Sequence, residues 1–232
     1  MMKRICAAFF GLIAILPNAP AFAAETVTIA GSRAVLIMPY SPRASVILMP
    51  GSDGAILAGD HGDIHGLNGN QLVRTRDAYV ARGLAVLVVD VGTNLKSAVD
   101  YMAEIKRPVT VIATSAGTWR AAEGIARGAR PDALVLTSGI LSPESGPASR
   151  NVESILGSPS ALPPTLVIHH RYDGCNLTRP SGVDPFIKWA SGRARVSWLL
   201  GGVNQGNPCY ADAYHGFKGL DDQVVDLAAG FR

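Results

Sequence analysis

Short apolar segments alternate with amphipathic helical patterns along most of this chain. Segment 84–89, Leu-Ala-Val-Leu-Val-Val, is apolar throughout, which is typical of a parallel strand covered on both faces. The other expected strands are 27–29, 34–38, 45–49, 109–113, 133–137, 165–169 and 196–200. Helical patterns follow Asn70 up to Gly83 and recur at 95–105, 119–126 and 224–231. The alternation predicts an α/β domain with a mostly parallel, doubly wound sheet of about eight strands flanked by helices.

The composition supports a packed domain and excludes several other classes. Of 232 residues, 48% are hydrophobic and 17% are charged, which excludes a disordered tail and a long coiled coil. The net charge of +3 is too small and too dispersed to indicate a nucleic-acid partner. Neither a repeat nor a linker divides the chain, so we expect a single domain over 24–232. The Ser-rich stretch 142–149 is expected to be a surface loop.

The first residues have the pattern of an export signal. Lys3 and Arg4 precede an apolar run over 5–16, and a small-x-small pattern ends at Ala23. The run is shorter than the roughly 20 residues that a membrane-spanning helix needs. We therefore expect residues 1–23 to be a cleaved signal peptide, with an uncleaved anchor as the alternative. The mature protein is expected to be periplasmic or extracellular, with no stable membrane span.

Three cysteines occur, and one of them, Cys6, lies in the predicted signal. The remaining pair, Cys175 and Cys209, most simply forms one disulfide in an exported protein. Two separate thiols are the alternative.

Ser115 stands where a strand changes into a helix. The expected strand 109–113 runs into Thr114-Ser115-Ala116-Gly117, and small residues suit a sharp turn with a crowded backbone. Such a turn lifts the serine hydroxyl clear of the sheet, beside a helix N-terminus. This pattern favours a nucleophile, although small residues alone would also permit a tight structural turn.

An aspartate and a histidine follow Ser115 along the chain. Asp173 follows the expected strand 165–169, and His215 comes late, just before the terminal helix. With its order of Ser115, Asp173 and His215, the chain resembles the α/β-hydrolase superfamily, particularly its small single-domain esterase-like members. The resemblance covers roughly 45–217 and departs at Ala113, where the superfamily usually has glycine. The connection between the expected strands 133–137 and 165–169 is short, so it leaves no room for a large cap domain.

The resemblance implies a role for each residue. Ser115 would attack an acyl carbon after His215 removes its proton, and His215 would then protonate the leaving group. Asp173 would hold the imidazole tautomer and stabilise the imidazolium. Asp184 is the rival acid, but it lies farther from its strand.

An oxyanion hole would need two donors. The amide of Ala116 follows the nucleophile, and Ser52 is our choice for the second donor, with Asp53 as the next candidate. Ser52 and Asp53 lie in a loop that begins Met49-Pro50-Gly51, with Pro50 where the superfamily usually has histidine. An ordinary glycine turn is the alternative interpretation of this loop.

The favoured function is therefore an exported serine hydrolase that cleaves a small-molecule or polymeric ester through an acyl-enzyme and needs no cofactor. A serine peptidase or amidase on the same scaffold is the first alternative, because esters and amides use the same nucleophile and oxyanion hole. A non-catalytic hydrolase-like binding module is the second. Because Cys175 and Cys209 lie near Asp173 and His215 in sequence, their disulfide is expected to support the catalytic geometry as well as stability.

Several other polar residues invite a functional interpretation. A glycine-rich stretch carries four of them, which we expect to form a plain polar loop rather than a metal site or a substrate rim: Asp60, His61, Asp63 and His65. Arg74 and Arg76 are expected on a solvated helix face rather than at an anionic substrate. Of His169 and His170, one is expected to pack in the sheet and the other to line the site.

Overall fold

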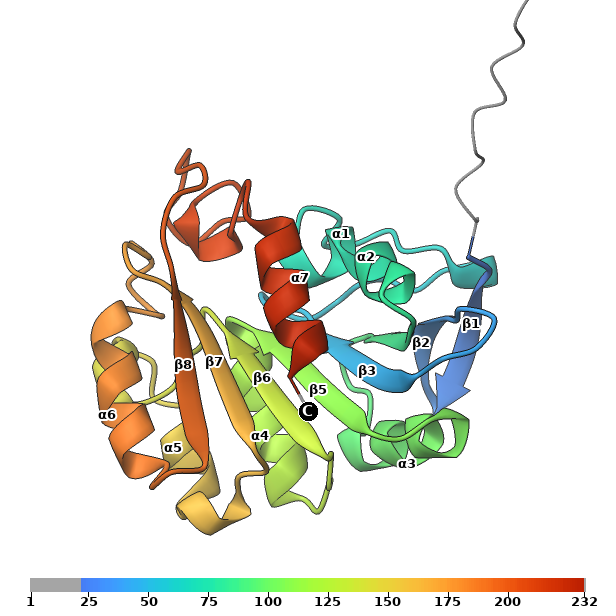
Figure 1. The fold of residues 1–232 in the computed structure, drawn as a ribbon, viewed down its shortest axis with the longest axis horizontal. Coiled ribbons are helices and arrows are strands. Elements are labelled where there is room, and N and C mark those ends of the chain that lie inside the picture. Colours follow the sequence, from blue (N-terminus) through green and yellow to red (C-terminus); the bar gives the residue numbers. More distant parts are fainter. Residues whose placement is uncertain (1–21, 232) are drawn as a thin grey trace, which may run out of the picture.

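The fold is built on a single mixed sheet, seen in a computed structural model that describes residues 22–231. Within these residues the sheet has eight strands in the order β1-β2-β4-β3-β5-β6-β7-β8 (Figure 1). They are β1 Ala24–Ile29, β2 Ser32–Ile37, β3 Ala44–Met49, β4 Leu84–Val89, β5 Val109–Thr114, β6 Ala133–Thr137, β7 Thr165–His170 and β8 Ala194–Leu199. The β1–β2 and β2–β4 pairs are antiparallel and the others are parallel, which confirms the predicted mostly parallel sheet.

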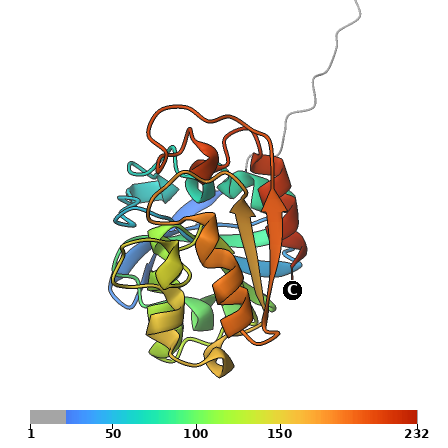
Figure 2. The same cartoon turned by 90° about the vertical axis from the view of Figure 1, so that its left-hand side faces the viewer.

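Helices cover both faces of the sheet (Figures 1 and 2). They are α1 Gln71–Arg74, α2 Arg76–Ala81, α3 Leu95–Ile105, α4 Ala116–Ala126, α5 Val152–Leu156, α6 Val183–Trp189 and α7 Asp221–Gly230. Alternate residues of β4 face opposite layers: Leu87 packs in the core with α3, α4 and α6, whereas Val86 and Val88 pack with α1, α2 and α7. The continuous apolar run of this strand thus has the two-sided burial that the sequence predicted.

The helix expected from Asn70 to Gly83 is divided in two. Asn70 does cap it, since its side chain accepts the Leu72 N–H, but Thr75 interrupts the helix between α1 and α2. The Thr75 hydroxyl donates to the carbonyl of Gln71 at 2.6 Å. A side chain that binds the backbone of the preceding turn competes with regular helix geometry.

The segment between β6 and β7 is compact. It holds α5, which the sequence pattern did not predict, and two short 3-10 turns, Pro143–Ser145 and Pro159–Ala161. The expected absence of a large cap domain agrees with this connection. The prediction of a surface loop over 142–149 is partly wrong, because Ser142 and Ser145 are buried. The Ser145 hydroxyl accepts from the amide of Leu141 at 3.0 Å and so holds this stretch against the body of the protein.

The predicted signal peptide lies almost wholly outside the described residues. The first strand begins at Ala24, directly after the predicted cleavage point, so cutting there would leave the sheet intact. None of the helices between residues 22 and 231 is long and apolar enough to cross a bilayer.

Candidate active site

Ser115 lies on a sharp turn between β5 and α4. Its backbone angles are φ 51° and ψ −125°, a conformation that costs energy for a residue with a side chain. The loop after β3 packs directly against this turn. A Cβ on Gly51 would lie 2.9 Å from the Cβ of Ser115, and one on Gly117 would lie 2.3 Å from the carbonyl oxygen of Met49. The small residues of this motif are therefore required by the close approach of two backbone segments.

Ser115 and His215 line the same cavity, which has a volume of about 650 Å³ and is called the Ser115 cavity below. Ser52 and Ala116 also line it. Neither of their amides donates to a protein acceptor within residues 22–231, so both are free to bind a ligand oxygen. The remaining wall is largely apolar and includes Leu67, Ile140, Leu177, Tyr210 and the two cysteines.

Asp173 lies directly behind His215. Its Oδ2 is 3.0 Å from His215 Nδ1, and its Oδ1 accepts the amide of Cys175 at 2.9 Å. The buried hydroxyl of Thr178 donates to the same Oδ2 at 2.9 Å and lies 3.0 Å from His215 Nδ1. In a neutral imidazole, a proton held on Nδ1 by the carboxylate leaves Nε2 free to accept one, as a base requires. Sequence reasoning missed Thr178, because no motif marks its position.

Arg74 helps to hold the segment that carries His215. Its guanidinium donates to the carbonyl of Gly216 at 2.7 Å and forms a two-pronged ion pair with Asp221 at the start of α7. The side chain is only 18% exposed, so the expected solvated position is wrong. In addition, the buried hydroxyl of Ser138 donates to the carbonyl of His215 at 2.8 Å. These contacts fix the two successive backbone carbonyls of His215 and Gly216.

His169 and His170 are both fully buried and neither lines the Ser115 cavity, so the expectation that one of them would do so is wrong. His169 Nε2 donates to the carbonyl of Thr178 at 2.9 Å and lies 3.6 Å from Asp173 Oδ2. Burial lowers the pKa of His169 to about 4, so it is neutral at physiological pH. His170 stacks on Tyr214 and donates to the carbonyl of Gly201.

The other polar residues that the sequence analysis considered as functional candidates lie outside the Ser115 cavity. Asp184 is exposed in the first turn of α6 and does not line the Ser115 cavity. The polar loop at 60–65 lies beside β1 and β2, and none of its four acidic and histidine side chains lines that cavity either. Asp60 instead pairs with Arg33 at 2.6 Å, which lowers the pKa of the carboxyl group. Within residues 22–231, no group of three or more histidine, cysteine or acidic side chains is arranged to hold a metal ion.

Cys175 and Cys209 form a disulfide, with their Cα atoms 4.5 Å apart. The bond joins the segment after β7, which carries Asp173, to the segment that leads to His215. Both cysteines contribute to the wall of the Ser115 cavity. The pairing expected from the cysteine count is therefore present, at the point where the two segments meet.

These features define an α/β-hydrolase fold, and solved structures share it. An esterase of Pyrococcus furiosus is 14% identical with a TM-score of 0.63, over 91% of this chain and 89% of that one. The esterase domain of a Rhodothermus marinus protein is 15% identical with a TM-score of 0.61, over 91% and 99%. A dienelactone hydrolase of Anabaena variabilis is 16% identical with a TM-score of 0.55, over 91% and 96%. No protein-family model and no curated protein sequence matches the chain.

Proposed function

We propose that this protein is an exported serine hydrolase that cleaves carboxylic esters through an acyl-enzyme. The observation that carries the proposal is that one cavity is lined by Ser115, a carboxylate-bound His215, and Ser52 and Ala116, whose amides donate to no acceptor within residues 22–231. The esterase and dienelactone hydrolase structures that share the fold support ester hydrolysis as the reaction class.

In the proposed reaction, Ser115 Oγ bonds to the ester carbonyl carbon while its proton passes to His215 Nε2. The carbonyl oxygen becomes an oxyanion and accepts hydrogen bonds from the amides of Ser52 and Ala116. The tetrahedral intermediate then expels the alkoxide, which takes the proton from His215 and leaves as the alcohol. Asp173 keeps the imidazole oriented and stabilises its positive charge.

Water completes the cycle. It loses a proton to His215 as its oxygen attacks the acyl carbon, and the second tetrahedral intermediate returns Ser115 Oγ to its protonated form while the carboxylic acid leaves. Every atom comes from the ester and from water, so the reaction needs no cofactor.

The shape of the Ser115 cavity indicates the kind of ester. Its volume of about 650 Å³ lies in the range of sites for small organic ligands. Leu67, Ile140, Leu177 and Tyr210 make its wall apolar, so we expect an apolar acyl or alcohol group to bind there.

Labelling by a fluorophosphonate probe tests the nucleophile. We expect the wild-type protein to react at Ser115 and Ser115→Ala to remain unlabelled while it keeps its circular dichroism spectrum. Equal labelling of the two proteins, or no labelling of the folded wild type, would refute the proposal. A parallel series of chromogenic esters and peptide anilides, matched in acyl group, then separates an esterase from an amidase.

Export is tested by expressing the full chain in a bacterium and fractionating the cells. The protein should appear outside the cytoplasm with a mass that corresponds to a start at Ala24. An unprocessed mass in the cytoplasmic fraction would contradict the predicted signal.

A further inference from the structure

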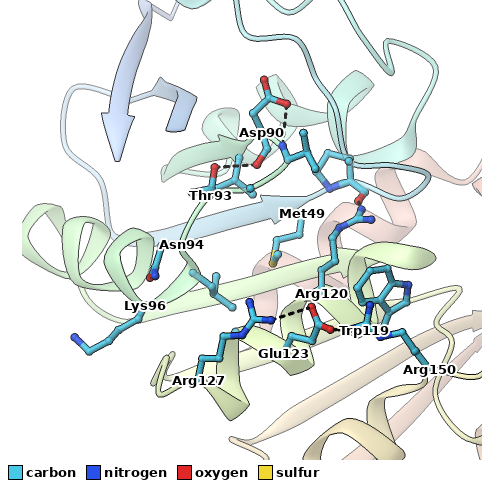
Figure 3. Close-up of a pocket in the computed structure, with 17 residues that line it drawn as sticks. Met49, Asp90, Thr93, Asn94, Lys96, Trp119, Arg120, Glu123, Arg127 and Arg150 are labelled. Carbon is cyan, nitrogen blue, oxygen red and sulfur yellow. Dashed lines mark hydrogen bonds and ion pairs between the residues drawn. The ribbon is translucent and has the colours of Figure 1, made fainter. Parts of the chain in front are cut away.

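A second hollow lies behind the loop that carries Ser52. This rear cavity has a volume of about 340 Å³ and opens between the loop after β4, the start of α3 and the outer side of α4. Its charged and aromatic lining is shown in Figure 3: Asp90, Lys96, Trp119, Arg120, Glu123, Arg127 and Arg150. Arg120 differs from the other cations, because its guanidinium points along the loop after β3 rather than at a carboxylate.

Three consecutive carbonyl groups of that loop accept hydrogen bonds from Arg120. The distances from its guanidinium nitrogens are 2.5 Å to the Pro50 oxygen, 3.3 Å to the Gly51 oxygen and 2.8 Å to the Ser52 oxygen. Figure 3 shows the side chain extended from α4 toward this backbone. The guanidinium therefore fixes the orientation of three successive peptide groups from one side.

The geometry of the peptide bond gives these contacts a consequence on the other side. In a trans peptide the C=O and the N–H of the next residue point in opposite directions. The bond between Gly51 and Ser52 is trans. When the Gly51 carbonyl is held toward Arg120, the Ser52 amide must point away from Arg120, and Ser52 also lines the Ser115 cavity.

The loop is strained at Ser52, and the Gly51 carbonyl accepts the amide of Gly54 at 3.0 Å in addition to Arg120. Ser52 has a φ of 52°, in the left-handed region that disfavours residues with a side chain. Arg120 also packs closely against the loop, since a Cβ on Gly54 would lie 2.9 Å from its Nη2. Within residues 22–231 no carboxylate lies within ion-pair distance of Arg120, whereas Arg127 and Arg150 both pair with Glu123. The donors of Arg120 are therefore committed to the backbone.

We propose that Arg120 is a positioning residue that aims the Ser52 amide at the oxyanion. The inference rests on the proposed hydrolase function and adds to it a residue that does not touch the substrate. Arg120 acts on the transition state alone, because the charge on the carbonyl oxygen develops only there.

Kinetics of Arg120→Met, Arg120→Lys and the control Arg127→Met test this role. Arg127→Met removes the same charge from the same cavity, but its side chain is 78% exposed and contacts no loop carbonyl. For Arg120→Met we expect kcat to fall about tenfold to hundredfold with KM within about twofold, because deleting an oxyanion donor outright costs roughly hundredfold to thousandfold. Arg120→Lys should lie between this variant and the wild type, and Arg127→Met should match the wild type.

Millimolar guanidinium ion provides a second readout. The rear cavity opens to solvent, so guanidinium should restore part of the kcat of Arg120→Met and leave Arg127→Met unchanged. A general loss of stability would not be rescued in this way. If Arg120→Met does not fold, Arg120→Lys decides, and a kcat for it equal to that of the wild type overturns the proposal.

The proposal is also overturned if Arg120→Met keeps the wild-type kcat, or loses activity only in proportion to its folded fraction. Failure of the hydrolase function itself would appear earlier, as a folded wild-type protein that neither reacts with fluorophosphonate nor cleaves any ester. The two failures are therefore distinguishable.

Discussion

Replacing Cys175 and Cys209 by alanine together should weaken both the fold and the proposed chemistry. The disulfide joins the segment of Asp173 to the segment of His215. Residues 200–208, which precede Cys209, are all exposed, so few packing contacts hold them in place. On the other side of the bond, Cys175 is 1% exposed, and its amide binds Asp173. Loss of the bond therefore frees mainly the segment that leads to His215.

The size of the stability loss follows from the closed loop. The bond spans a sequence separation of 34 residues. In the loop-closure model, a ring of about that size stabilises the folded state by roughly 3.8 kcal/mol, an upper value because the unfolded chain retains some structure. For a domain of this size, such a change lowers Tm by about 8 to 15 °C.

The activity loss is measured well below the reduced Tm. Circular dichroism first establishes a temperature at which the double alanine variant is fully folded. At that temperature we expect kcat for a short-chain ester to be lower than in the wild type, because the approach of His215 to Ser115 is less well defined. The oxidised and reduced forms of the wild-type protein provide the matched comparison. Full activity of the folded variant would show that the bond serves stability alone and would refute the geometric argument.

Three further predictions concern single residues. Thr178→Val removes the hydroxyl shared by the acid and the base, and should lower kcat about tenfold with KM unchanged, whereas Thr178→Ser should retain activity. His169 is neutral when buried, with a pKa of about 4 against 6.5 when exposed, so the unfolded chain binds the proton first as pH falls. Between pH 7 and pH 4, the free energy of unfolding measured by denaturant titration should therefore fall by up to about 3 kcal/mol, and His169→Gln should flatten this pH dependence. An unchanged pH dependence in His169→Gln would refute the assignment to His169. Gly117→Ala would place a Cβ 2.3 Å from the carbonyl oxygen of Met49 and should destabilise by about 3 kcal/mol or more, while Gly230→Ala, with open space around it, should change Tm little. Equal Tm values for the two glycine variants would contradict the close approach.

Local patterns in the sequence were sufficient to locate the strands. The apolar run of β4 and the strand-to-helix change at Ser115 each depend on residues close together in the chain, and both are present in the structure. The same kind of reasoning failed at Thr75, where one hydroxyl interrupts a helix whose apolar pattern continues. Two short helices, α5 and α6, also escaped it, because neither is long enough for a clear period.

The candidate site could be predicted only in part from such local patterns. Residue type, order along the chain and position after a strand were enough to nominate Ser115, Asp173 and His215. The contacts that hold the site in place could not be predicted, since Arg74 binds Asp221 across 147 residues of sequence and Arg120 binds Ser52 across 68. Such contacts leave no periodic signal in the sequence.

The sequence by itself determined which segments become strands and where the small residues of the serine turn lie, because burial on two faces and a crowded turn restrict each position locally. The order of the strands and the hydrogen bonds between distant segments were decided only by the tertiary structure. A polar side chain such as Arg74, Arg120 or Thr178 has many possible partners in an extended chain. Packing of the helices on the sheet leaves each one beside a particular carbonyl or carboxylate, and burial then makes that partner necessary.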